Sequence, residues 1–167
     1  SDASNKPDPA DGLAHAGFVI TWFGGPVAFH SKKLRHVGIS SEHNEYMGIT
    51  FAVRRIIWLR QLIEELGVAP RLLQTPTIIL GDNVQANRLC REHFVTTGNQ
   101  YIFQAYHLNK EATDLGIVDL RWINTKLNTA DLLTKATSRQ VMEALIDMLT
   151  GYATPQQWSA IRAAASL

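Results

Sequence analysis

The sequence lacks most of the features that would assign it to a functional class at once. Its 167 residues contain one cysteine, Cys90, so the chain offers neither an internal disulfide framework nor a cysteine-based metal cluster. The six histidines show neither a zinc-finger spacing nor an H-E-x-x-H pattern. The phosphate-binding patterns G-x-x-x-x-G-K-[ST] and G-x-G-x-x-G are missing as well. A catalytic or binding site in this chain would therefore have to use other residue types.

Long apolar runs and a strong net charge are also absent. No run approaches the roughly 20 residues of a transmembrane helix, no signal-peptide pattern is visible, and we expect no membrane partner. Lys plus Arg number 16 and Asp plus Glu number 15, giving a net charge of +1, which neither indicates nor excludes a nucleic-acid partner. With 46% hydrophobic and 19% charged residues, the chain has the composition of one globular domain with a substantial core.

Hydrophobic periodicity predicts an α/β protein. The segments "GFVITW" (17–22) and "PVAFHSKK" (26–33), joined by "FGG", indicate a β-hairpin. Further strands are expected at 77–80 and 116–124. A long amphipathic helix is expected from Ser41, as N-cap, to Gly67, with further helices at about 83–92, 99–114, 129 onward, 138–149 and 155–165. A hairpin placed before alternating strands and helices favours a mixed sheet.

The stretch "TIILGDNVQAN" places Asp82 at the tip of a predicted buried strand. Aspartate is a common turn and N-cap residue, which is one explanation for its position. The other is functional, because strand tips in α/β sheets face the crevice where ligands bind. Asp82 by itself does not decide between the two.

Three more carboxylates are candidates for the same site. Glu45 continues the inward stripe of the long helix, which includes Ile49, Val53 and Ile56, although a first-turn acid also complements the helix dipole. Asp131, in "NTADLLTK", either caps the last helix after the 116–124 strand or joins the site. Asp2, in "SDAS", has little local context.

A cluster of such acids would be informative because gathered carboxylates repel one another and raise one another's pKa values. Proteins tolerate that arrangement mainly when a hard cation neutralises it. Oxygen ligands without His or Cys suit Mg²⁺, or Mn²⁺ as a substitute, better than zinc. Two such ions about 4 Å apart would serve a phosphoryl displacement.

The motifs "SDAS", "GFVITWFGGPVAFHSKK", "SSEHNEYM", "LGDNVQA", "YHLNKE" and "NTADLLTKA" resemble, in this order, the ribonuclease H domain of copia-type LTR retrotransposon polyproteins. The resemblance runs from Asp2 to about Lys135. It implies a ribonuclease H-like fold, a five-stranded mixed sheet with helices on both faces, and two Mg²⁺ ions held by Asp2, Glu45, Asp82 and Asp131. Asp2 and Asp82 would be shared ligands, and Glu45 and Asp131 would each complete the shell of one ion.

The resemblance also implies a substrate and a set of contacts. The substrate would be an RNA–DNA hybrid, recognised through the 2′-OH groups of its shallow minor groove. The residues expected to bind it are Ser40, Ser41, Asn83, Lys32, Lys33 and Asn128. Helix capping and a solvated surface are the plain alternatives for the serines and lysines. Asn128 stands where the copia-type pattern usually has Gln.

The resulting hypothesis is a metal-dependent endonuclease that cleaves the RNA strand and leaves 3′-OH and 5′-phosphate ends. Residues 1–150 would form the ribonuclease H domain and 151–167 a C-terminal helical tail packed on it or extending from it. The domain would follow a reverse transcriptase in an intracellular, cytoplasmic polyprotein, inside a virus-like particle. There are two alternatives. One is a non-catalytic connector or nucleic-acid-binding module, which is favoured by the largely truncated first strand, because only Ser1 precedes Asp2. The other is an integrase-like or junction-cleaving protein with the same fold.

Overall fold

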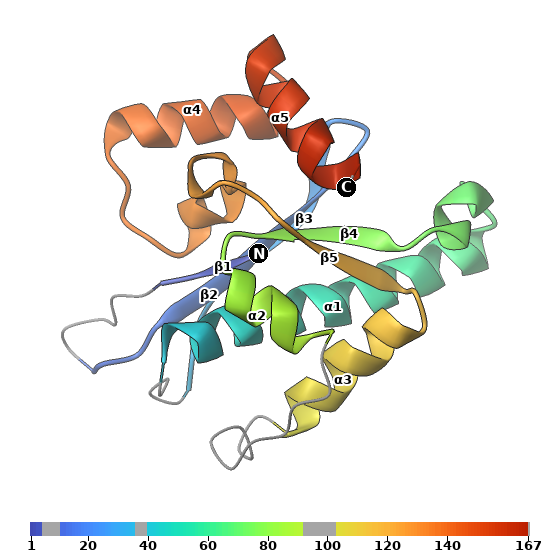
Figure 1. The fold of residues 1–167 in the computed structure, drawn as a ribbon. Helices are drawn as coiled ribbons and strands as arrows, with labels where there is room; N and C mark the ends of the chain where they lie inside the picture. Colours follow the sequence, from blue (N-terminus) through green and yellow to red (C-terminus); the bar gives the residue numbers. More distant parts are fainter. Residues whose placement is uncertain (5–10, 36–39, 92–102, 167) are drawn as a thin grey trace.

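The five strands lie in two hydrogen-bonded sheets in the computed structural model, which describes residues 1–4, 11–35, 40–91 and 103–166 (Figure 1). The first sheet is antiparallel, in the order β1 (Asp2–Ala3), β2 (His15–Trp22) and β3 (Gly25–Lys33). The second pairs β4 (Thr77–Gly81) with β5 (Val118–Trp122) in parallel. The α/β class is confirmed.

The expected single five-stranded sheet was wrong, because the hydrogen bonds divide the strands into a three-stranded and a two-stranded sheet. The backbone nitrogen of Ser1 donates to the carbonyl of Leu80 at 2.8 Å, which places β1 beside β4. With two residues, however, β1 pairs in register only with β2, and a ladder on both edges needs a longer strand. Beyond this link, a cavity of about 350 Å³ lies between residues 18–22 of β2 and 77–80 of β4.

The predicted helices are present with adjusted bounds. They are α1 (Ser41–Leu66), α2 (Val84–Leu89), α3 (Phe103–Asp114), α4 (Arg139–Leu149) and α5 (Pro155–Ser166), with 3₁₀ turns η1 (Pro70–Gln74), η3 (Thr125–Leu127) and η4 (Thr129–Leu133). The helix expected from about residue 129 is thus a 3₁₀ turn. The turn η1 lies between α1 and β4, and the 99–102 start of the third helix lies outside the described residues.

The ends of α1 follow from its capping residues. The N-cap is Ser40, whose side-chain oxygen accepts from the backbone N–H of His43, so the expected cap at Ser41 was off by one residue. Gly67 adopts the left-handed conformation (φ 65°) and closes the helix, as its sequence position predicted. Two adjacent serines offer the same capping chemistry, and only the backbone geometry distinguishes them.

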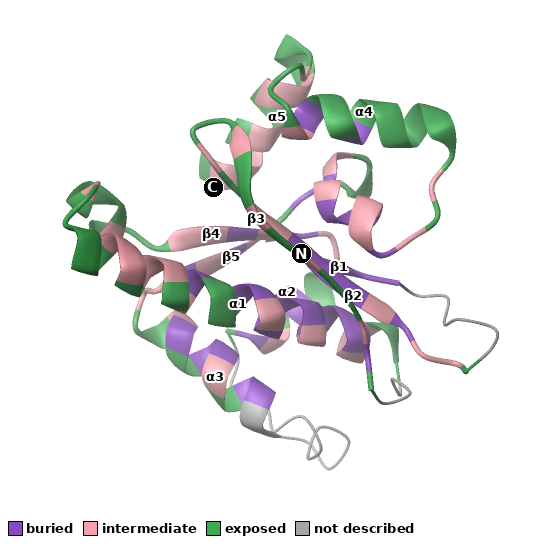
Figure 2. Ribbon diagram, turned by 180° about the vertical axis from the view of Figure 1, so that it is seen from behind, coloured by how far each residue is buried: buried purple, intermediate pink, exposed green. Residues whose placement is uncertain are grey.

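The core lies between α1 and the strands. The inward face of α1 is buried from Glu45 through Ile49 and Val53 to Ile56, whereas Leu59 and Ile63 further along the helix are only partly buried. Figure 1 shows α1 and α3 on one side of the strands and α4 and α5 on the other, so helices flank both sides. Buried residues concentrate on α1 and the strands, whereas α4 is largely exposed (Figure 2).

The C-terminal helix α5 contacts β4 and β5, and the guanidinium of Arg121 donates to the carbonyl of Ala165. This contact fits a tail packed on the preceding residues, and the domain boundary near residue 150 stays a prediction. Among the described residues, no helix combines the length and apolar character that crossing a membrane requires.

Candidate metal centre

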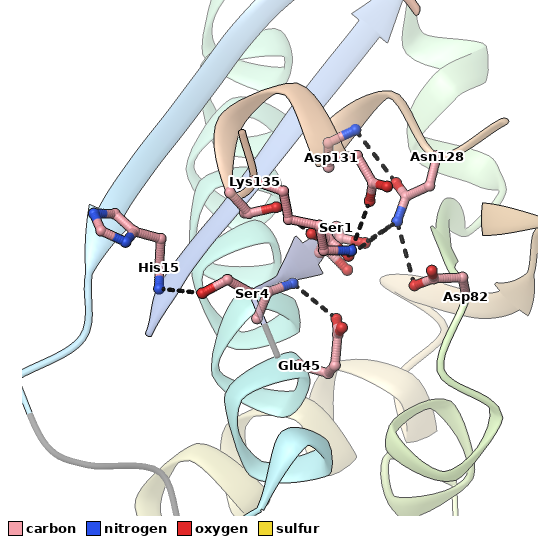
Figure 3. A network of polar contacts seen from close by, with 12 residues as sticks. Ser1, Ser4, His15, Glu45, Asp82, Asn128, Asp131 and Lys135 are labelled. Carbon is pink, nitrogen blue, oxygen red and sulfur yellow. Dashed lines mark hydrogen bonds and ion pairs between the residues drawn. The ribbon is translucent and has the colours of Figure 1, made fainter. Parts of the chain in front are cut away.

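Three aspartates from distant parts of the chain converge beside the end of β4; Figure 3 shows two of them, Asp82 and Asp131, with Asn128 and Lys135. Asp2 lies in β1, Asp82 directly follows β4, and Asp131 lies in η4. One carboxylate oxygen from each lies within 4.8 Å of the others. The structure thereby brings together three of the four acids that the sequence singled out.

Glu45 lies beside this trio and turns toward the backbone of β1. Its Oε2 accepts a hydrogen bond from the N–H of Ala3 at 2.9 Å, and the residue is 5% exposed. The inward phase predicted for Glu45 is therefore correct. In this arrangement its carboxylate joins β1 to α1 rather than completing the group of three aspartates.

A close approach of β1 to α1 sets the position of Asp2. The residue is fully buried and pairs with Gly17 of β2. On the other side, a Cβ added to Gly48 of α1 would lie 2.8 Å from the carbonyl oxygen of Asp2. Glycine in a helix interior is unfavourable relative to alanine, so its presence here is explained by the space that β1 needs.

The side chain of Asp2 is also held from η4 and the residues that follow it. The hydroxyl of Thr134 donates to its Oδ2, and the ammonium of Lys135 lies 3.1 Å from its Oδ1. These contacts hold the Asp2 carboxylate on both of its oxygens.

Asn128 connects the aspartates with one another. Its Nδ2 lies 3.2 Å from the carbonyl of Ser1, 3.3 Å from Asp82 Oδ1 and 3.5 Å from Asp2 Oδ1. Its Oδ1 accepts from the backbone N–H of Ala130 at the start of η4. The residue is 4% exposed, so in this state it orients the carboxylates rather than facing solvent.

Lys135 is the cation of the cluster. Its Nζ lies 3.1 Å from Asp2 Oδ1 and 3.1 Å from Asp131 Oδ1. Burial by itself would lower the pKa of Lys135, but the charges of Asp2 and Asp131 outweigh it and raise that pKa. The ammonium therefore stays charged between the two aspartates.

The remaining electrostatics reflect burial and mutual repulsion. Burial, followed by the charges of Asp2 and Asp82, raises the pKa of Glu45 to about 8. Burial and then the charge of Asp2 raise the pKa of Asp131 to about 6, against the opposing effect of Lys135. Glu45 and Asp131 thus hold a proton more tightly than ordinary surface acids do, and added positive charge would stabilise their ionised forms.

The other predicted binding residues are spread over several elements. Ser40 caps α1 and Ser41 is its exposed first residue, while Asn83 next to Asp82 caps α2 by accepting from the N–H groups of Gln85 and Ala86. Lys33 pairs with Asp11 at 2.6 Å. The ammonium of Lys32 lies 5.6 Å from the ring centre of Phe51. These positions assign structural contacts to Ser40, Asn83 and Lys33 and leave their binding roles as predictions.

Sequence reasoning did not identify three residues that belong to the site. Lys135 had marked only the end of the family resemblance, and Gly48 and Thr134 had not been noted. The spacing of Asp131 and Lys135, four residues apart, was a usable signal for their ion pair. No local signal relates Gly48 or Thr134 to Asp2, because these pairs are distant in sequence.

The donor set suits a hard divalent cation. It consists of carboxylate oxygens without histidine or cysteine ligands, and the described cluster carries four acids, with Lys135 as the side-chain ammonium among them. Oxygen donors with excess negative charge are the ligands preferred by Mg²⁺ and Mn²⁺. The arrangement therefore defines a carboxylate-rich candidate metal centre at the edge of an α/β fold.

Comparison with known proteins relates the chain to transposon polyproteins. It is 28% identical over 143 residues to the retrovirus-related Pol polyprotein from transposon TNT 1-94 of Nicotiana tabacum. It is 30% identical over 139 residues to that of transposon RE2, and 29% identical over 143 residues to that of RE1, both of Arabidopsis thaliana. These matches cover 83–86% of this chain but only 9–10% of each relative. The sequence matches no protein-family profile.

The homologues support a copia-type Pol region as the origin of this chain. Because the chain spans about a tenth of these polyproteins, their names do not say which of their activities it carries. That assignment must come from the site.

Proposed function

We propose that the chain is a ribonuclease H domain that hydrolyses the RNA strand of RNA–DNA hybrids. The observation that carries this proposal is the convergence of Asp2, Asp82 and Asp131 within 4.8 Å. They come from three motifs that resemble the metal-binding positions of copia-type ribonucleases H. The transposon Pol relatives supply a context in which an RNA–DNA hybrid is an expected substrate.

Asp2, Asp82, Asp131 and Glu45 would hold two Mg²⁺ ions, with Mn²⁺ as a substitute. When bound, such ions supply activation of the attacking water and stabilisation of charge at the scissile phosphate. Asp2 and Asp82, joined by Asn128, are suited to be the shared ligands because their orientation is already fixed. Glu45 would have to release the N–H of Ala3 to turn its carboxylate to the same centre.

Lys135 has a defined part in this proposal. Its ammonium lies between Asp2 and Asp131, in contact with oxygens that a metal ion would need. It would swing aside when the cation binds, and its partial exposure allows that movement. The long lysine side chain would then face the substrate backbone as a phosphate contact.

Substrate binding would begin at the N-terminal end of α1. Ser40 and Ser41 are proposed to contact the hybrid there, with the serine hydroxyls meeting the RNA 2′-OH groups. Asn83 and Asn128 adjoin the carboxylates, and Lys32 and Lys33 would add phosphate contacts from β3. In the polyprotein, the domain would follow the reverse transcriptase, in the cytoplasm and within a virus-like particle.

A cleavage assay tests the proposal directly. A labelled RNA–DNA hybrid incubated with the protein and Mg²⁺ should lose its RNA strand, and EDTA should stop the reaction. Asp82→Asn should abolish cleavage while leaving the circular dichroism spectrum unchanged. The matched control is Asp147→Asn, an exposed aspartate on α4, which should cleave at the wild-type rate. Unchanged turnover of Asp82→Asn would refute the mechanism.

One observation favours the alternative of a non-catalytic module with the same fold. Lys135 already neutralises part of the cluster, so the fold does not need an ion to tolerate these acids. A protein that binds hybrid in EDTA but cleaves it with neither Mg²⁺ nor Mn²⁺ would establish that alternative. Cleavage of a DNA duplex in preference to the hybrid would instead indicate an integrase-like or junction-cleaving activity.

A further inference from the structure

A second surface, separate from the carboxylate cluster, combines aromatic rings with unpaired cations. Residues Phe51, Arg54, Arg55 and Trp58 follow one another at i, i+3, i+4 and i+7 of α1 and therefore share one face of the helix. Two alternate residues of β3, His30 and Lys32, extend this face onto the first sheet. These six residues are called the α1–β3 platform below.

The rings of the platform are arranged around a shallow pocket. A pocket of about 280 Å³ is lined by Phe18, His30, Phe51, Arg54, Arg55 and Trp58. The His30 ring meets Phe51 edge to face at a centroid distance of 5.8 Å. Trp58 is 49% exposed, so about half of this large side chain is accessible to solvent. The pocket therefore offers a ring face to a flat partner.

The cations of the platform lie over its rings. The guanidinium carbon of Arg55 lies 5.2 Å from the centre of the Trp58 ring, and the ammonium of Lys32 lies 5.6 Å from that of Phe51. Among the described residues, none of Lys32, Arg54 and Arg55 forms an ion pair with a carboxylate, and no carboxylate lines the pocket. The three positive charges are thus available to an external anion.

We propose that the α1–β3 platform binds single-stranded nucleic acid. Unpaired bases would stack on Trp58 and in the pocket beside Phe51, while Arg54, Arg55 and Lys32 would contact successive phosphates. Rings interleaved with basic side chains are the arrangement that binds single strands without sequence preference. A duplex is a poorer partner for this surface, because its bases are stacked on one another and their faces are covered.

The proposal goes beyond hydrolysis at the carboxylate cluster and does not depend on it. Lys32, proposed above to contact a hybrid phosphate, would also contribute to the single-strand surface. The platform would hold an unpaired strand while the carboxylate cluster holds a hybrid. Binding can be measured in EDTA, where no cleavage occurs, so the failure of one proposal leaves the other intact.

Fluorescence anisotropy of labelled 12-mers of oligo-dT and oligo-U, in EDTA and at several salt concentrations, tests the platform. We expect Trp58→Ala to weaken binding about tenfold and Trp58→Phe to restore most of it. Arg54→Gln and Arg55→Gln should each reduce the slope of log affinity against log salt by about 0.7, the value for one phosphate contact on a single strand. Comparison of the two oligonucleotides shows whether the sugar matters.

Matched controls separate the platform from general surface charge. Tyr152→Ala removes another exposed aromatic residue, and Arg162→Gln removes an exposed arginine on α5, and both should bind as the wild type does. A 12-base-pair DNA duplex should compete weakly. Equal binding by Trp58→Ala and the wild type, equal competition by the duplex, or better competition by a poly-glutamate peptide would overturn the proposal, the last in favour of a protein partner.

Discussion

Replacing Lys135 by methionine tests how much the Lys135 ammonium stabilises the carboxylate cluster. The substitution keeps the length and the apolar stem of the side chain but removes the ammonium that lies 3.1 Å from both Asp2 and Asp131. Asp2 is completely buried, so its charge would lose a partner that water cannot replace. Methionine itself is well tolerated in irregular sites, so the effect reports the lost charge.

The size of the effect follows from the burial of the partners. Breaking a buried ion pair by removing one member costs about 3–5 kcal/mol. The side chain of Lys135 is 29% exposed, so we expect the lower end, about 3 kcal/mol. For a chain of this size, that loss lowers the melting temperature by about 6–12 °C. Lys126→Met, which removes an exposed ammonium, should change it by less than about 2 °C.

Adding Mg²⁺ distinguishes a metal centre from an ordinary ion-pair network. An ion present at a hundred times its dissociation constant stabilises the folded state by about 2.7 kcal/mol. The variant should therefore recover most of its loss with Mg²⁺, and gain more than the wild type, in which the ion must first displace Lys135. Thermal denaturation of both proteins in EDTA and in Mg²⁺ gives the comparison. Equal melting temperatures in EDTA, or a variant that does not respond to Mg²⁺, would refute the reasoning.

Three further predictions concern the same cluster. Asp82→Asn should raise the melting temperature in EDTA by a few degrees, because it removes one of the repelling charges; a decrease would contradict a repulsive cluster. Gly48→Ala should lower the free energy of unfolding by about 1–3 kcal/mol in urea denaturation and should reduce cleavage. The reason is that the new Cβ would lie 2.8 Å from the backbone carbonyl oxygen of Asp2. In a helix without that contact, the same substitution would raise stability. The folded chain raises the pKa of Glu45 from 4.5 to about 8, so it binds more protons than the unfolded chain between these values. Stability in EDTA should therefore fall as the pH rises from about 4.5 to about 8, and Glu45→Gln should flatten this part of the denaturation profile.

The sequence by itself determined the local features of this protein. The hairpin and the long helix α1, the left-handed Gly67 at the end of α1, the inward phase of Glu45 and the strand-tip position of Asp82 all follow from periodicity, capping chemistry and turn residues. These signals act over a few residues, so they can be read along the chain. Where two neighbours offer the same chemistry, as Ser40 and Ser41 do, local reasoning could not choose between them.

Only the tertiary structure decided which groups meet in the cluster. Lys135 lies beside Asp131 by helical spacing, but its contact with Asp2 joins residues 133 positions apart. The contact of Gly48 with β1, the placement of Asn128 between Asp2 and Asp82, and the division of the strands into two sheets likewise depend on how α1, η4 and the strand edges pack. Packing fixes the distances between groups that are remote in the chain, and those distances set the hydrogen bonds, the burial and the pKa values of the site.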